Sequence, residues 1–412
     1  MRSVSEHRHV VAELITPRPA VTVALTEAAG LVLAADVIAE LSLPVFDNSA
    51  MDGYAVAAAD VAAATPDNPV KLPVAEDIPA GRSDALTLRP GTAHRIMTGA
   101  PLPVGATAVV PVEATAGGSH WAGDISAGTD TVSITTAAKP GQHIRRAGED
   151  VTAGTKVLRT GQVVTPAALG LAAALGLREL SVIPRQRVLV VSTGSELVAP
   201  GTPLQRGQIY ESNAIMLAAA VRDAGAEVLA APMAGDDVAQ FTAVLDRYAE
   251  QADLIITTGG VSAGAYEVVK DALGRTGDQT VEFVKVAMQP GMPQGAGRWA
   301  GTPIVTLPGN PVSALVSFEV FVRPALRAAM GLPDPDRQRR TAVLTEGLTS
   351  PRGKRQFRRG VLDPAAGTVT SYGPPASHHL RWLASANCLL EIGEDVTDIN
   401  TGSTVRVWDL SS

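Results

Sequence analysis

One stretch, Asp253–Gly264 (DLIITTGGVSAG), constrains the fold of this chain more than any other. Its apolar run Leu254–Ile256 is short and rich in β-branched residues, which predicts a strand buried on both faces, as in a parallel sheet. Gly259 and Gly260 then end the strand, and a helical pattern resumes near Ala265. Such a turn exposes backbone N–H groups at a helix N-terminus and favours anion binding. A tight connection without a ligand is the alternative.

The composition narrows the class of protein. A chain of 412 residues is too long for one core and predicts roughly two to four domains. The net charge of −7 argues against a general nucleic-acid binder. The single cysteine, Cys388, excludes an internal disulfide framework and a zinc site of several cysteines, and it suits a reducing compartment. The first residues show no secretory h-region and no apolar run approaches the length of a membrane span, so we expect a cytoplasmic protein.

Strand and helix patterns alternate from residue 187 to residue 329. Besides the opening stretch, the pattern predicts strands at Val188–Val191, Glu227–Ala231, Val281–Ala287 and Thr302–Leu307, and helices at Ser212–Asp223, Val238–Glu250, Tyr266–Leu273 and Val312–Ala329. Ile215 is expected among the packing residues of its helix. The alternation predicts a three-layer α/β domain with a largely parallel sheet.

The regions on either side of residues 187–329 lack this alternation of strands and helices. Short apolar segments separated by turn residues predict a β-rich domain between about residues 56 and 140, and an alternating pattern from Arg337 onward predicts a small C-terminal β domain. Near the N-terminus, helices are predicted at Val4–Leu14 and at Ala28–Ala35. Further along the chain, Thr165-Pro166 is expected to start another helix.

Three turns follow predicted strands of the α/β domain, at Ser192–Glu196, Thr257–Gly264 and Pro308–Ser313. All should lie at the carboxyl edge of the sheet, where open α/β folds bind ligands. In the last turn, Asn310 is placed to cap a helix, which would leave the N–H groups of Val312 and Ser313 and the Ser313 hydroxyl for an anion.

Acidic residues are expected at the same edge: Glu196, Asp236, Asp237 and Glu267. Carboxylates beside an anion pocket would repel the ligand, and a Mg²⁺ ion between them would resolve that conflict. Helix capping or simple solvation is the alternative for each acid taken singly.

Two further clusters stand out. The basic run Arg352–Arg359 (RGKRQFRR) is either a solvated hairpin face or a clamp for a polyanionic substrate, and its one aromatic residue disfavours a nucleic-acid surface. His378 and His379 are adjacent, so they make a poor chelate, and we assign no zinc.

Distinctive motifs occur along nearly the whole chain: PVFDNSAMDGYAV (44–56), RIMTGAP (95–101), IRRAGEDV (144–151), VVSTGSEL (190–197), IYESN (209–213), TTGGVSAG (257–264), LPGNPVSA (307–314), FRRG (357–360) and SH…AN (377–387). Taken together, these motifs resemble the molybdopterin molybdenumtransferase family, to which bacterial MoeA and the E-domains of gephyrin and plant Cnx belong.

The resemblance implies a multidomain α/β plus β architecture. Its parts would be an extended domain (1–45 and 141–180), an inserted β-rich domain (46–140), an α/β domain similar to molybdopterin adenylyltransferase (181–330) and a C-terminal β-barrel-like domain (331–412). It also implies a homodimer whose site lies between protomers, and no nucleic-acid or membrane partner.

The implied activity is the insertion of molybdate into adenylylated molybdopterin, with Mg²⁺ assistance and release of AMP. Molybdopterin adenylyltransferase would be the upstream partner. The substrate brings its own dithiolene sulfurs, so a chain with one cysteine is suited to this role.

The resemblance also implies site residues, position by position. Catalytic positions would be Asp52, Thr98, Asp150, Glu196 and Glu267. Substrate and anion positions would be Gly194, Gly259, Gly260, Ser262, Pro308, Gly309, Asn310, Pro311, Ser313, Arg359 and Ser377. The metal ligands would be Asp236, Asp237 and Glu267.

Some positions depart from the family pattern. Ala265 stands where an acid is usual, Glu267 where Asp is usual, Gln289 where a lysine is usual, and Arg381-Trp382 where small hydroxyl residues are usual. Lys285 or Arg381 could replace the charge missing at Gln289. The departures leave open a second interpretation, a catalytically weakened paralogue that binds molybdopterin or acts as a scaffold.

Overall fold

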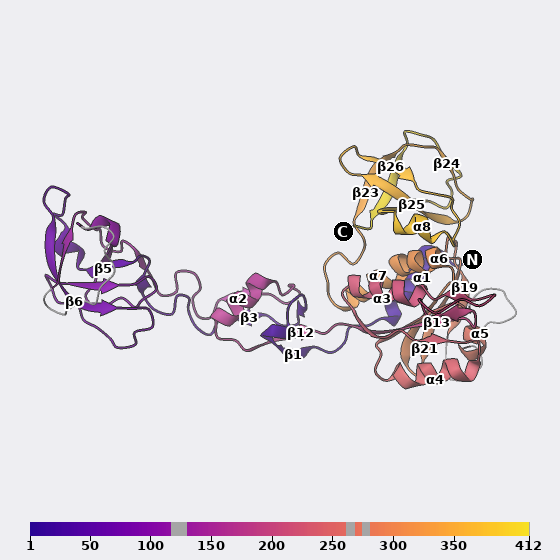
Figure 1. Cartoon of the computed structure of the whole chain (residues 1–412), viewed down its shortest axis with the longest axis horizontal. Coiled ribbons are helices and arrows are strands. Elements are labelled where there is room, and N and C mark those ends of the chain that lie inside the picture. The colour runs from indigo at the N-terminus through magenta and orange to yellow at the C-terminus, as the bar shows by residue number, and fades with distance from the viewer. Residues whose placement is uncertain (117–129, 261–267, 274–280, 412) are drawn as a thin grey trace. The chain divides into compact units, whose positions relative to one another are not determined.

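The computed structural model describes residues 1–116, 130–260, 268–273 and 281–411. They form two compact units (Figure 1). The larger contains Met1–Val23, Gly30–Ala34 and Ser181–Ser412, and the smaller contains Ala24–Ala29 and Ala35–Leu180. No helix within the described ranges is long and apolar enough to span a bilayer.

The larger unit is built on a seven-stranded sheet. Its strand order is β16 (Glu227–Ala230), β13 (Arg187–Thr193), β18 (Leu254–Thr258), β22 (Thr302–Leu307), β21 (Pro293–Trp299) and β19 (Glu282–Lys285), and β17 (Met233–Ala234) also pairs with β13. The strands β16, β13, β18 and β22 pair in parallel, whereas β21 and β19 are antiparallel. The predicted, mostly parallel sheet is therefore confirmed.

Side chains alternate across this sheet into two cores. Val188, Val190 and Ile256 pack on one face, with α1 (Val4–Leu14), α3 (Asn213–Asp223) and the segment α6 (Pro311–Ser317), η4 (Phe318–Val322) and α7 (Arg323–Ala329). Leu189 and Ile255 pack on the other face, with α4 (Val238–Ala249) and α5 (Val268–Leu273). Figure 1 shows α4 and α3 on opposite sides of the sheet. The three layers follow from the period of two along each strand.

The long C-terminal helix of this layer is not uniform. The predicted helix Val312–Ala329 is α-helical at each end, with the π-helical turn η4 between α6 and α7.

The prediction that Ile215 of α3 packs in the core is wrong. Its side chain is 58% exposed, while Leu217 and Val221 of the same helix are buried.

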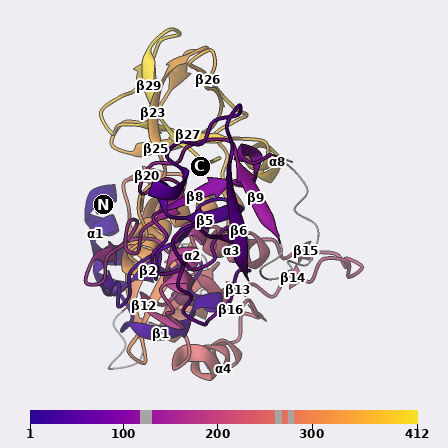
Figure 2. The same ribbon diagram turned by 90° about the vertical axis from the view of Figure 1, so that its left-hand side faces the viewer.

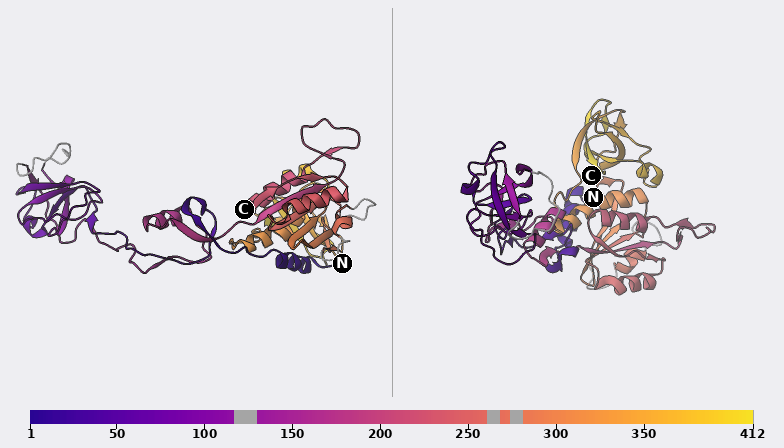
Figure 3. Two further views of the ribbon diagram at one scale, coloured as in Figure 1. Left: turned by 90° about the horizontal axis from the view of Figure 1, so that it is seen from below. Right: turned by 60° about the vertical axis from the view of Figure 1, so that its left-hand side comes forward.

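The C-terminal region forms a closed β sheet, as predicted (Figure 3). Its strands are β23 (Arg339–Leu344), β25 (Arg355–Asp363), β26 (Thr368–Ser371), β27 (Cys388–Ile392) and β29 (Thr404–Asp409). Closure occurs because β25 pairs with both β26 and β27. The short strand β20 (Met288–Gln289) pairs in parallel with β25, so that a segment of the α/β chain joins the barrel. The barrel also carries β24 (Leu348–Thr349), β28 (Asp398–Ile399) and the helix α8 (Leu380–Ala384).

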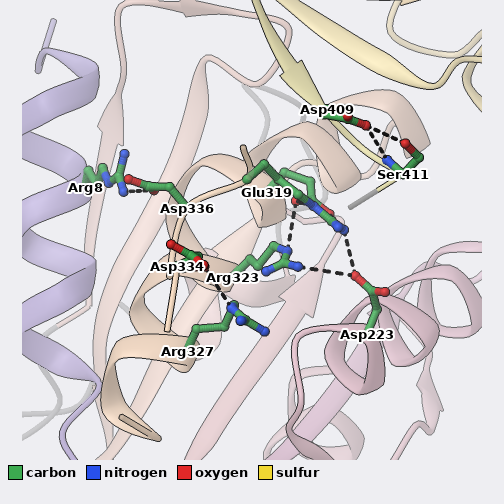
Figure 4. A network of polar contacts seen from close by, with 10 residues as sticks. Arg8, Asp223, Glu319, Arg323, Arg327, Asp334, Asp336, Asp409 and Ser411 are labelled. Atoms are coloured by element: carbon green, nitrogen blue, oxygen red, sulfur yellow. Dashed lines mark hydrogen bonds and ion pairs between the residues drawn. The ribbon is translucent and has the colours of Figure 1, made fainter. Parts of the chain in front are cut away.

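A buried polar network lies where the chain passes from the α/β layers into the barrel (Figure 4). Glu319 is 5% exposed, and Arg337 donates to both of its carboxylate oxygens, at 2.9 and 3.0 Å. Arg337 also donates to Asp223 at 2.7 Å, and Arg323 lies 3.5 Å from Glu319. This network therefore joins η4, α3 and the segment that leads into β23. Removing any one partner would leave an uncompensated buried charge, which destabilises the fold.

The smaller unit contains a five-stranded sheet. Its order is β8 (Ala108–Pro111), β5 (Gly53–Val56), β7 (Ala93–Ile96), β6 (Val70–Ile78) and β9 (Thr131–Ile134). Figure 2 labels β5, β6, β8 and β9. The same unit contains β3 (Val37–Ile38) paired with β11 (Lys156–Leu158), β4 (Asn48–Ser49) paired with β10 (Ile144–Arg145), and α2 (Pro166–Ala174) with Thr165 as its N-cap. The predicted β-rich domain and the helix start are confirmed.

The predicted helix Ala28–Ala35 is wrong. The chain instead makes a 3-10 turn η1 (Leu25–Glu27) and a strand β2 (Val32–Leu33) that pairs with β12 (Glu179–Ile183). Val32 and Leu33 are 1% and 0% exposed, so pairing with a strand distant in sequence overrides the local helical preference.

The N-terminal helix α1 begins and ends where the sequence predicts. Ser3 and Glu6 form a capping box, with the Ser3 hydroxyl accepting from the Glu6 N–H at 3.1 Å. The helix packs on the α/β core, and His7 lies edge-on to Phe321 of η4. The four-domain division, which assigns residues 1–45 to an extended domain, remains a prediction.

Candidate functional site

A cavity of about 1100 Å³ opens at the carboxyl ends of β13, β18 and β22. It brings together most of the predicted residues that lie in the larger unit. Those lining it are Gly194, Glu196, Asp236, Gly259, Gly260, Pro308, Gly309, Asn310, Pro311, Ser313 and Ser377. Ser262 and Glu267 lie outside the described residues.

The first main-chain turn of the cavity depends on Gly259. Its φ is +91°, and a Cβ atom there would lie 2.6 Å from the carbonyl oxygen of Thr193 in β13. The Thr193 hydroxyl in turn donates to the Thr258 carbonyl at 3.0 Å. This hydrogen bond holds the ends of the neighbouring strands β13 and β18 together. Only glycine at position 259 lets the two main chains approach so closely.

The second turn, Pro308–Pro311, is completed by the barrel. Asn310 occupies the N-cap position of α6, yet its side chain makes no capping bond and instead donates to the Ser377 hydroxyl at 3.0 Å. The Val312 N–H donates to the Ser377 carbonyl at 3.1 Å. The expectation that Asn310 caps the helix and leaves the Val312 N–H free is therefore wrong. The hydroxyl of Ser377 accepts from the Asn310 side chain, and its carbonyl accepts from the Val312 N–H.

Arg359 holds the loop that carries Ser377. Its side chain is buried, and its guanidinium donates to the carbonyls of Ala376 and His379 at 3.3 and 3.0 Å, and to that of Pro374. Burial, and then repulsion from Arg358, lowers its pKa. The sequence predicts that Arg359 contacts the substrate. In the structure Arg359 does not line the cavity, but it holds the main chain of Ala376 and its neighbours, which line it.

The two predicted substitutes for a cation at Gln289 do not reach the cavity. Lys285 lies in β19, opposite Pro293, and the Arg381 guanidinium stacks 4.9 Å from the Trp382 ring centroid. Neither belongs to the lining, whereas Gln289 does.

The acidic residues at this edge separate into two groups. Glu196 and Asp236 line the cavity, and Asp236 exchanges hydrogen bonds of 3.0 Å with Ser195. Asp237 lies outside the lining and caps α4 by accepting from the Gln240 N–H at 2.8 Å.

A magnesium ion would find carboxylate ligands at this edge of the cavity. In the described ranges no group of three or more His, Cys, Asp or Glu side chains could hold a metal by itself. Mg²⁺ commonly takes one or two carboxylates and completes its shell with water and substrate phosphates. Glu196 and Asp236 fit that mode of binding.

In the smaller unit, Asp52 and Thr98 form one hydrogen-bonded pair. The Asp52 carboxylate accepts from the Thr98 N–H at 2.7 Å and from its hydroxyl at 2.8 Å. These bonds, the backbone one first, lower the pKa of Asp52, so the exposed carboxylate is held ionised and oriented. Asp150 is also exposed, and its N–H donates to the Leu43 carbonyl at 3.0 Å.

The sequence reasoning missed three residues of the cavity. Glu211 is buried and accepts from the Ser192 hydroxyl at 2.8 Å and the Ala214 N–H at 2.6 Å. Asn213 donates to the Gly309 carbonyl at 2.7 Å and so holds the second turn. Lys354 enters from the barrel. The IYESN motif was a signal for the first two, and the basic run contained the third without distinguishing it.

Three family models match the chain in order. They are the "MoeA N-terminal region (domain I and II)" over residues 2–176, the "Probable molybdopterin binding domain" over 189–328, and the "MoeA C-terminal region (domain IV)" over 341–410.

Curated relatives and solved structures agree with these matches. The chain is 73% identical to molybdopterin molybdenumtransferase 2 of Mycobacterium tuberculosis, with all of both chains covered. It is 38% identical to molybdopterin molybdenumtransferase 1 of the same species, covering 99% of this chain and 98% of the relative. A molybdopterin biosynthesis MoeA protein from Pyrococcus horikoshii has a similar structure, with a TM-score of 0.80, 28% identity and coverage of 100% and 99%.

Proposed function

The chain belongs to the molybdopterin molybdenumtransferase family, and on this premise we propose that it inserts molybdenum into molybdopterin. The substrates would be adenylylated molybdopterin and molybdate, and AMP would be released. Its relatives' names supply the reaction class, and the geometry of the cavity supports it.

The observation that carries the proposal is the pairing of two main-chain turns in one cavity. Gly259-Gly260 and Pro308–Pro311 both line it, and both follow strands of the parallel sheet. Molybdate and the phosphates of the pterin substrate are anions, and main-chain N–H groups at such turns receive oxyanions. The cavity is also large enough for a substrate of this size.

The residues of this chain would act mainly by positioning. Asn213 and Ser377 hold the second turn, Arg359 holds the Ser377 loop, and Gly259 keeps the first turn close to β13. Fixing the reactants in one geometry lowers the barrier without a protein nucleophile. A Mg²⁺ ion at Glu196 and Asp236 would offset the charge of the phosphates.

Further parts of the proposal concern assembly and context. We expect a homodimer in which Asp52 and Thr98 of one protomer act on substrate held by its partner, with Asp150 as a further acidic functional residue. We also expect a cytoplasmic protein that receives its substrate from molybdopterin adenylyltransferase.

The experiment is to incubate the purified protein with adenylylated molybdopterin, molybdate and Mg²⁺ and to measure AMP release. We expect release that depends on molybdate and is lost in Asp52→Ala. Asp236→Asn should reduce it about 100-fold, as for loss of a group that holds the metal. Asp237→Asn is the matched control, because it removes a neighbouring charge that only caps α4. Tight pterin binding without AMP release would overturn the proposal.

That outcome would instead support a second candidate, a catalytically weakened paralogue that binds molybdopterin or acts as a scaffold. One observation favours it: the relative of 73% identity is the second of two such proteins named in one species. Gln289, neutral in the cavity lining, is consistent with it.

A further inference from the structure

The described lining of the cavity carries more acidic than basic side chains, although the ligand proposed for it is itself anionic. Glu196, Glu211 and Asp236 lie along its α/β side. Among the lining residues that the structure describes, Lys354 is the sole lysine or arginine. Like charges repel more strongly where water is partly excluded, so a bound anion here requires positive charge from the protein or from a metal.

The main chain fixes the position of Lys354. This residue directly precedes β25, whose first residues pair in parallel with β20, Arg355 opposite Met288 and Gln356 opposite Gln289. The Arg355 N–H also donates to the Ala287 carbonyl at 2.9 Å. The strand that contains Met288 and Gln289 lines the cavity, so Lys354 extends from the barrel at the same rim.

Three of the other cations of the basic run have partners elsewhere, and the fourth, Arg352, is exposed and does not line the cavity. Arg355 donates to Glu394 at 3.0 Å, Arg358 donates to Gln356 at 2.9 Å, and Arg359 donates to main-chain carbonyls. For Lys354, which is half-buried, no carboxylate of the described residues lies within ion-pair distance. Its ammonium charge is therefore not neutralised by a described side chain.

We propose that Lys354 binds the oxyanion portion of the substrate in this cavity. The inference rests on the proposed function and names the side chain that supplies its anion site with charge. A lysine is suited to this task, because its compact charge on a flexible four-carbon stem can follow a tetrahedral oxyanion. The oxyanion is either molybdate or a phosphate of the pterin substrate.

The test compares the wild type with Lys354→Gln, Lys354→Arg and Lys71→Gln. Lys71 lies exposed on β6 of the smaller unit and is not among the lining residues, so its substitution makes the same charge change outside the lining. Binding of molybdate and of inorganic phosphate is measured by titration calorimetry at low salt. AMP release is then measured with each substrate varied in turn.

For Lys354→Gln we expect the Kd of the oxyanion to rise about tenfold, as for the loss of one charge-assisted contact. The KM of one substrate should rise in parallel, while kcat changes by less than about threefold. Lys354→Arg should recover most of the affinity, and Lys71→Gln should match the wild type. A rise confined to the KM of molybdate identifies that anion, and a rise confined to the KM of the pterin identifies its phosphate.

Three results would overturn the assignment of Lys354. One is a Kd and both KM values within twofold of the wild type in Lys354→Gln. Another is an equal loss in Lys71→Gln, and the third is a wild-type protein that binds neither anion. If the wild type binds the anion but releases no AMP, the proposed reaction fails while the titrations still decide the role of Lys354.

Discussion

The two sides of the cavity present different groups to a ligand. The α/β side presents two main-chain turns, at Gly259-Gly260 and Pro308–Pro311, besides its acidic side chains. The barrel side presents the Lys354 side chain, just before β25, and Ser377, on a loop that Arg359 holds in place. A main-chain site depends first on the conformation of its turns, which Gly259 sets at the first turn and the side chains of Asn213 and Ser377 hold at the second. A side-chain site depends on the residues that fix its loop. The two sides should therefore fail in different ways.

The largest expected effect is on the α/β side. In Gly259→Ala the new Cβ would lie 2.6 Å from the Thr193 carbonyl oxygen at a φ of +91°. We expect a loss of about 3–5 kcal/mol in the free energy of unfolding, from strain and overlap together. The measurement is urea denaturation, with molybdate binding as a second observable.

Gly353→Ala is its control on the barrel side. Gly353 has a φ of +80° but nothing within 4 Å of an added Cβ. It should therefore lose about 1 kcal/mol, from conformation alone. Equal losses at the two glycines would show that close main-chain approach is not what distinguishes the α/β side.

The next effect is on the barrel side, in Arg359→Ala. Loss of the bonds to the carbonyls of Pro374, Ala376 and His379 should free the loop that carries Ser377. We expect kcat/KM to fall about 100-fold, with partial recovery in Arg359→Lys. Hydrogen exchange should also become faster at the Val312 N–H, which donates to the Ser377 carbonyl. Unchanged exchange with lost activity would instead indicate that Arg359 contacts the substrate.

A smaller effect concerns the helix layer behind the α/β side. Burial, followed by repulsion from Arg2, lowers the pKa of His7 to about 4 from 6.5, while Glu282 acts in the opposite sense. The unfolded chain therefore binds the proton more tightly, and stability should fall as the pH drops from 6.5 towards 4. Between pH 7 and pH 5 the loss should be about 2 kcal/mol.

Denaturation at the two pH values measures this loss. In His7→Phe, an aromatic substitution beside Phe321, that component of the acid sensitivity should disappear. If the variant keeps the full pH dependence, His7 is not its source.

The smallest effect concerns the barrel core. Burial raises the pKa of Cys388 to about 12, so the thiol should not react with a disulfide reagent at pH 8 in the folded protein. It should react fully after denaturation. Because Cys388 is the single cysteine of the chain, the signal has one source. Rapid reaction under native conditions would mean that the barrel opens more readily than the main chain of the α/β side.

Local patterns were sufficient for the α/β side. The apolar run Leu254–Ile256 followed by Gly259-Gly260 predicts a buried strand and a tight turn, and both are present. Strand burial and a tight glycine turn follow from residues adjacent in sequence, so they can be predicted from it. The same holds for the Thr165 cap. Alternation of elements predicted the parallel sheet for a similar reason. The close approach of Gly259 to the Thr193 carbonyl, by contrast, was decided by the pairing of β18 with β13.

Partners distant in sequence were decided by the tertiary structure. Asn310 donates a hydrogen bond to Ser377 instead of capping its own helix, and Arg359 donates to carbonyls of the loop that carries Ser377. Lys354 reaches the cavity because β25 pairs with β20. Val32 and Leu33 form a strand because β12 is available to pair with them. Apart from that strand, sequence by itself determined most of the strands, helices and glycine turns, since these follow from local sterics and periodicity. Only the packed chain decided which polar group each side chain meets, because that choice depends on which segments folding brings together.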